Sequence, residues 1–167
     1  MLKNPVFQKI LNEILWLSLI AIVCIGLLYP IVNLGEYKFL WQTIMFIGIA
    51  ILYSRWVVFF KEIDYLKNKW VKVFIFLLNF QVIIFTVNRL QEIIPLWETQ
   101  SLLEFLYHIK RELSLDRTVF FLAYIKNVVL VSGISSCVAI VFLSVRIFSS
   151  FFSGNKIRKQ EMLNDLK

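Results

Sequence analysis

Four long apolar runs separated by charged segments constrain this chain more than any other feature. A bilayer core about 30 Å thick requires roughly 20 apolar residues in a helix, and helices keep their backbone groups paired in lipid. The runs cover about 10–33, 39–60, 70–88 and 118–146. Since 59% of the 167 residues are hydrophobic, well above the usual share in soluble domains, we expect one membrane domain, an all-α polytopic protein with four transmembrane helices.

The segment between the third and fourth runs has a helical pattern but is too charged to span. Its apolar residues recur with the spacing of one helical face, and Ser101 to Glu104 fits a capping box. These apolar positions are Leu102, Phe105, Leu106, Ile109 and Leu113. The pattern predicts an external amphipathic helix over about 95–115, lying at the membrane surface or capping the bundle.

The basic residues are unevenly distributed between the two sides that the four runs define. Twelve of the 18 Lys and Arg residues fall on the side of the termini and the 61–69 connector. The positive-inside rule therefore places both termini, including the basic tail 153–167, in the cytoplasm. The other six are Lys38, Arg89, Lys110, Arg111, Arg117 and Lys126.

The net charge of +7 indicates a lipid partner rather than nucleic acid. The basic residues sit at the ends of apolar runs instead of forming a basic, polar face with spaced aromatic residues. We therefore expect contacts with the bilayer and with anionic headgroups on the cytoplasmic side. A composition rich in Ile, Lys, Phe and Asn and poor in Ala suggests an AT-rich bacterial source, and so the inner (plasma) membrane.

Three basic residues lie inside the predicted spans or close to their ends: Arg55, Lys126 and Arg146. One interpretation is that they snorkel to the headgroups. The other is that they contact a pore or an anionic-lipid pocket, which several copies around an axis would create.

Small and polar residues in the third and fourth spans indicate helix packing. Amides and hydroxyls within a membrane usually bond to neighbouring helices, and small residues let backbones approach closely. Lining of a pore or contact with a ligand is the alternative. The residues expected to pack are Asn79, Gln81, Thr86, Ser132, Gly133 and Ser136.

The external segment also carries the one histidine of the chain. Its polar face comprises Glu104, His108, Arg111 and Glu112. Carboxylates and imidazole at this spacing suit a metal or a pH-sensitive cluster, but a solvated face with i, i+4 pairs explains them as well, and Arg111 disfavours a cation. We therefore expect no metal and no other cofactor.

No catalytic motif stands out in the sequence, which favours a non-enzymatic protein that acts through assembly. The first hypothesis is a homo-oligomeric channel, pore or membrane-effector protein. The second is an accessory or anchoring subunit bound to another membrane protein. The third is a lipid-modifying membrane enzyme that would use Glu104, His108 or the interfacial basic residues.

Overall fold

The computed structural model describes residues 5–60, 68–98, 102–109 and 113–164, and most of them are helical. The four α-helices are α1 (Pro5–Leu34), α2 (Leu40–Val58), α3 (Lys69–Ile93) and α4 (Leu115–Asn164). Each contains a segment long and apolar enough to cross a membrane. This part of the predicted fold class, a mostly helical chain with four candidate spans, is confirmed.

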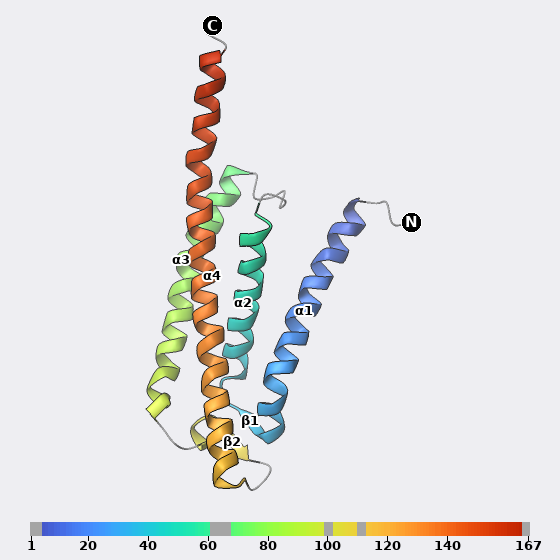
Figure 1. Cartoon of the computed structure of the whole chain (residues 1–167), viewed down its shortest axis with the longest axis vertical. Coiled ribbons are helices and arrows are strands. Elements are labelled where there is room, and N and C mark those ends of the chain that lie inside the picture. The colour runs from blue at the N-terminus through green and yellow to red at the C-terminus, as the bar shows by residue number, and fades with distance from the viewer. Residues whose placement is uncertain (1–4, 61–67, 99–101, 110–112, 165–167) are drawn as a thin grey trace.

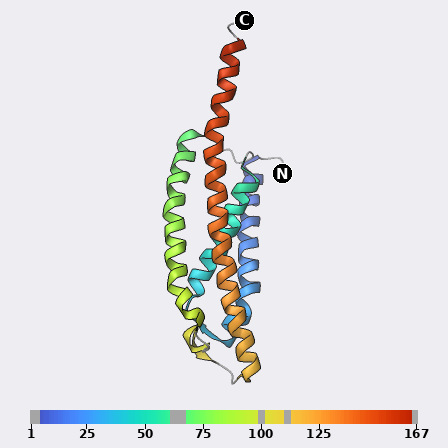
Figure 2. The same cartoon turned by 60° about the vertical axis from the view of Figure 1, so that its left-hand side comes forward.

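The helices run alongside one another, and each runs opposite to the one before it (Figures 1 and 2). Two short strands, β1 (Gly35–Tyr37) and β2 (Leu106–Ile109), lie together at one end of the molecule, here called the hairpin end. Helix α1 begins, and α4 ends, towards the opposite end, here called the terminal end. Helix α4 is the longest, and its last turns extend beyond the other three helices.

Local sequence explains where two of the helices begin and end. Asn68 caps α3, since its side-chain oxygen accepts a hydrogen bond from the Trp70 amide at 3.0 Å. Pro30 lies inside α1, which continues for another turn to Leu34. Proline removes one backbone hydrogen bond, and burial of Ile31 and Leu34 in the core holds the turn that follows it.

Two clusters of buried apolar side chains hold the bundle together. One cluster fills the hairpin end and includes Phe46, Phe105 and Ile125. The other fills the terminal half, where Tyr53 of α2 packs with Leu143 of α4. Each cluster combines residues from helices distant in the sequence, so the four helices are packed against one another rather than merely adjacent.

Strands β1 and β2 pair in antiparallel fashion and tie the connection after α1 to the segment before α4. At Gly35 a β-carbon would lie 2.1 Å from the His108 carbonyl oxygen, so no other residue fits this approach. The Tyr37 hydroxyl lies 3.0 Å from the Thr43 hydroxyl oxygen. Burial of this phenol raises the pKa of Tyr37 to about 12, so it stays protonated at neutral pH.

The predicted amphipathic helix over 95–115 is wrong where the structure describes this segment. Two 3₁₀ turns, Ile94–Glu98 and Leu102–Glu104, and strand β2 stand in its place. Residues 99–101 and 110–112 lie outside the described residues.

The helical spacing of Leu102, Phe105 and Leu106 has another explanation. All three side chains are buried because a turn folds them onto the hairpin end of the bundle. The backbone of this turn forms hydrogen bonds with a distant part of the chain, since the Lys38 amide donates to the Phe105 carbonyl at 2.9 Å. Pairing with β1 thus replaces the hydrogen bonds of a helix.

Candidate functional site

Arg55, near the end of α2, forms a bidentate ion pair with Glu13, near the start of α1. Its two terminal nitrogens donate to the two carboxylate oxygens at 2.6 and 2.5 Å. The Arg55 side chain is only 7% exposed, whereas Glu13 is 55% exposed. The guanidinium also lies 5.4 Å from the centre of the Trp16 ring. These contacts form an interhelical ion pair that joins α1 to α2 at the terminal end.

Arg146 joins α4 to the end of α2. One of its guanidinium nitrogens donates to the Val57 carbonyl oxygen, and the guanidinium lies 5.6 Å from the centre of the Phe60 ring. Carbonyls in the last turn of a helix lack partners within the helix and carry partial negative charge. Arg146 therefore adds a hydrogen bond to the last turn of α2.

Lys126 lies on α4, 20 positions before Arg146 and partly exposed. At about 1.5 Å per residue this separation is roughly 30 Å. The three basic residues singled out in the sequence are thus not brought together within one chain. Arg55 and Arg146 lie towards the terminal end, and Lys126 lies towards the hairpin end.

The polar residues of α3 divide between a buried face and an exposed one. Asn79 is buried, and its side-chain nitrogen donates to the Ser144 hydroxyl oxygen on α4 at 2.8 Å. Thr86 is also buried and donates to the Val82 carbonyl. Gln81, by contrast, is exposed. Two of the three residues expected to pack on this helix are therefore buried in the bundle, and one faces outwards.

One of the small residues on α4 lies where α3 comes close. Gly133 is in contact with Leu90, since a β-carbon on Gly133 would be 2.4 Å from a methyl carbon of that leucine. Ser132 and Ser136 are buried, and their hydroxyls donate to backbone carbonyls of α4 itself. The hydroxyls of both serines are therefore bonded within α4, and Ser132 also lines a cavity beside α1 and α2.

Of the external polar face, the structure describes only one side chain, that of His108. The His108 side chain is exposed on β2. The backbone of Glu104 ends the Leu102–Glu104 turn, while Arg111 and Glu112 lie outside the described residues. Within the described part of the chain, no three His, Cys, Asp or Glu side chains gather in a way that would hold a metal ion.

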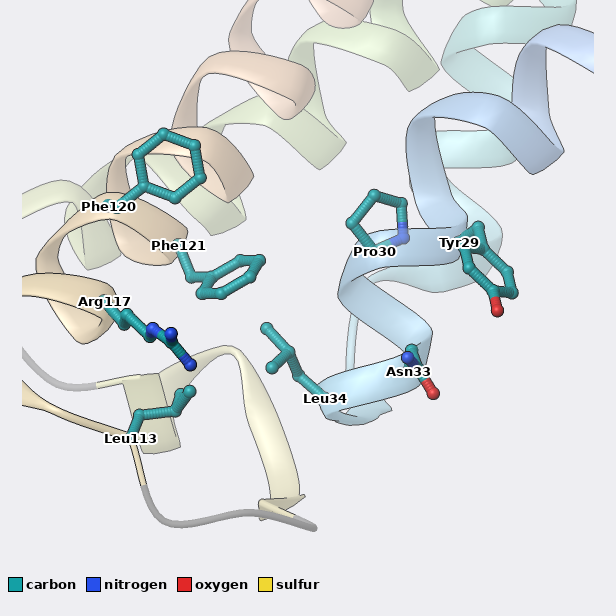
Figure 3. A pocket seen from close by; sticks show the side chains of 8 residues that line it. All are labelled: Tyr29, Pro30, Asn33, Leu34, Leu113, Arg117, Phe120 and Phe121. Atoms are coloured by element: carbon teal, nitrogen blue, oxygen red, sulfur yellow. The ribbon is translucent and has the colours of Figure 1, made fainter.

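The hairpin end contains a cavity of about 560 Å³, here called the hairpin-end cavity. The last turns of α1 form one wall, and Leu113 with the first turns of α4 forms the other (Figure 3). The lining residues are Tyr29, Pro30, Asn33, Leu34, Leu113, Arg117, Phe120 and Phe121.

A second cavity of about 360 Å³, the mid-span cavity, lies further along α1 and α4 and is also lined by α2. Aliphatic side chains of α1 and α2, among them Val23 and Ile51, face Val128 and Val131 of α4 there. The Tyr124 hydroxyl donates to the Leu27 carbonyl oxygen at 2.9 Å, which links α4 to α1 at this level. We call the line of contact between α1 and α4 the α1–α4 seam.

The sequence pattern indicates Arg55 but not its partner Glu13, and it indicates neither of the two cavities. The antiparallel order of the first two spans brings the start of one beside the end of the other, which was the available signal for the ion pair. The cavities depend on the angle between α1 and α4, which the sequence pattern does not reveal.

Comparisons of this chain with protein-family models, with curated proteins and with solved structures found no match.

Proposed function

We propose that this chain is a non-enzymatic, multi-pass membrane protein that acts by assembling with copies of itself. The proposal rests on the position and the exposure of Gln81. It lies at the middle of α3, 12 positions from either end of Lys69–Ile93, and its side chain is exposed. If α3 crosses the membrane, this amide lies near the centre of the hydrocarbon. An amide without a hydrogen-bond partner there is unfavourable, so a helix of another chain is its natural partner.

A second copy fits this role because a primary amide both donates and accepts hydrogen bonds. Two Gln81 side chains related by a twofold axis along the membrane normal can bond to each other at the same depth. Leu77 and Ile84, one turn before and after, are exposed apolar residues. They provide packing around the amide pair, which is needed because such a bond contributes only about 0.6–2 kcal/mol.

A channel is the more specific form of this proposal. A single bundle of four packed helices encloses no wide pore, so a pore would form between copies. Arg55 would not line it, because its guanidinium is buried against Glu13 within one chain. Ion conductance by the reconstituted protein tests this form, and an assembled protein that conducts no ion would reject it.

The same proposal includes location and orientation. Basic residues are concentrated on the side of the termini, which supports a bacterial inner membrane with the terminal end in the cytoplasm and the hairpin end outside. A membrane-impermeant maleimide should then label Tyr107→Cys from outside intact cells, and labelling only after lysis would reverse the orientation.

The mass of the extracted protein in nanodiscs tests the assembly. We expect a single species at a multiple of 19.8 kDa with no second protein. Gln81→Leu should shift it towards the monomer, whereas Gln91→Leu, an identical change at the end of α3, should leave it unchanged. A monomeric wild-type protein would contradict the proposal. A second protein in fixed ratio would instead make the chain an accessory subunit, and an unchanged Gln81→Leu mass would reject the role of this residue.

A further inference from the structure

The hairpin-end cavity combines apolar walls with one permanently charged group. Figure 3 shows Phe121, Leu34 and Leu113 around the space between α1 and α4, with the Arg117 guanidinium reaching towards Leu113. Asn33, in the last turn of α1, also lines the cavity. Apolar walls with a few convergent polar groups are the usual composition of a small-molecule site.

We propose that this cavity binds one anionic phospholipid of the outer leaflet. The lipid phosphate would pair with Arg117, and one acyl chain would lie along the α1–α4 seam into the mid-span cavity. The inference uses the membrane orientation proposed above but does not depend on self-assembly.

Charge complementarity selects an anion. Among the residues that the structure describes, no carboxylate forms an ion pair with Arg117, whereas Arg55 and Arg89 both have one. Asp116, its neighbour in sequence, is exposed in the first turn of α4 and does not line the cavity. An arginine donates two parallel hydrogen bonds to a phosphate, so a phosphate group supplies the partner that this guanidinium lacks.

The two cavities follow one another along the α1–α4 seam. On α1 they are lined by Pro30 and Leu27, and on α4 by Phe121 and Tyr124, so the members of each pair are three positions apart. The hydrogen bond from Tyr124 to Leu27 fixes the helices at this junction. An acyl chain that leaves the first cavity over this bond therefore meets the apolar walls of the second.

The depth of the α1–α4 seam matches one leaflet. Phe121 and Val131 lie ten residues apart on α4, which is about 15 Å along the helix. This is half of the roughly 30 Å hydrocarbon core. A soluble anion would contact only the Arg117 end, whereas a phospholipid would occupy both cavities. The length of the seam therefore favours a phospholipid.

Native mass spectrometry of the full-length protein, titrated with phosphatidylglycerol bearing two 16–18-carbon chains, tests the inference. We expect one tightly held lipid per chain and weaker binding of phosphatidylcholine. Arg117→Gln should weaken phosphatidylglycerol binding by about tenfold, while Arg117→Lys should retain most of it. Arg89→Gln, a matched change at the same end of the bundle, should have no effect. Val131→Trp, which fills the mid-span cavity without changing charge, should also weaken binding.

Equal binding by wild type and Arg117→Gln would overturn the inference, as would a Val131→Trp protein that binds normally. Displacement of the lipid by inorganic phosphate at the same concentration would also overturn it, because the site would then serve a soluble anion. Unchanged helical circular dichroism of Arg117→Gln, an exposed position, shows that folding is intact. A lost lipid signal with an unchanged oligomer mass rejects this inference alone, and a monomer that still binds lipid rejects the assembly alone.

Discussion

At the scale of single residues, the ion pair between Glu13 and Arg55 joins α1 to α2 at the terminal end. The arginine is buried and the glutamate is half exposed, so loss of the pair affects the arginine more than the glutamate. Removing one member of a pair weakens the compensation of a buried charge, whereas removing both charges is often neutral. The pair thus fixes how α1 is placed against α2 as much as it stabilises the fold.

We expect Glu13→Gln to lower the free energy of unfolding by about 1–3 kcal/mol, less than for a fully buried pair because Glu13 is half exposed. Adding Arg55→Met should restore most of the loss. Thermal unfolding of the wild type, Glu13→Gln, Arg55→Met and the double variant in one detergent measures this effect as a double-mutant cycle. Glu92→Gln, which breaks the exposed pair with Arg89, is the control and should cost less than about 1 kcal/mol. Equal effects of the two glutamate changes would show that burial of Arg55 is unimportant.

At the scale of elements, the pairing of β1 with β2 closes the hairpin end. Gly35→Ala would place a β-carbon against the His108 carbonyl oxygen, and backbone atoms cannot move aside as a side chain can. We expect the strands to separate at this point, with a loss of about 1–3 kcal/mol of stability.

Hydrogen exchange of the β2 amides measures this separation, and exchange should become faster in Gly35→Ala. Gly26→Ala in α1 is the matched control, because no atom lies within 4 Å of the added β-carbon. Its β2 exchange should match that of the wild type, and its stability should be equal or up to about 1 kcal/mol higher because alanine favours a helix over glycine. Unchanged protection of β2 in Gly35→Ala would mean that the two strands are not held by this close approach.

The helices of this fold could be predicted from the sequence, whereas the strands could not. Four helices could be predicted because each apolar run alone is long enough to define one. The hairpin could not, because β1 and β2 lie about 70 residues apart and each is too short to have a recognisable pattern. Leu102, Phe105 and Leu106 are buried as their spacing suggested, but by a turn and a strand rather than by a helix.

The candidate sites divide in the same way. Packing through Asn79, Thr86 and Gly133 follows from residue type, because small and amide side chains within a span indicate helix contacts. The partner of Arg55 and the space beside Arg117 depend on how the helices are placed in three dimensions. Contacts of this kind arise from packing and cannot be derived from the residues of one helix.

At the scale of the whole molecule, the bundle leaves many large apolar side chains exposed on all four helices, as expected for a lipid-facing surface. Gln81 is an exception on that surface because it is polar and central. The account therefore makes the face of α3 around Gln81 the contact between copies, and it assigns the α1–α4 seam to lipid.

Cysteine cross-linking in native membranes tests this central claim most directly. In a protein with Cys24 and Cys137 replaced by alanine, a single cysteine is placed at Leu77, Ile84 or, as a control, Ile22 of α1, which is equally exposed. A twofold axis along the membrane normal brings equal depths together, so the account predicts covalent dimers for positions 77 and 84 and not for 22. Absence of dimers at both α3 positions, or equal cross-linking at position 22, would contradict it.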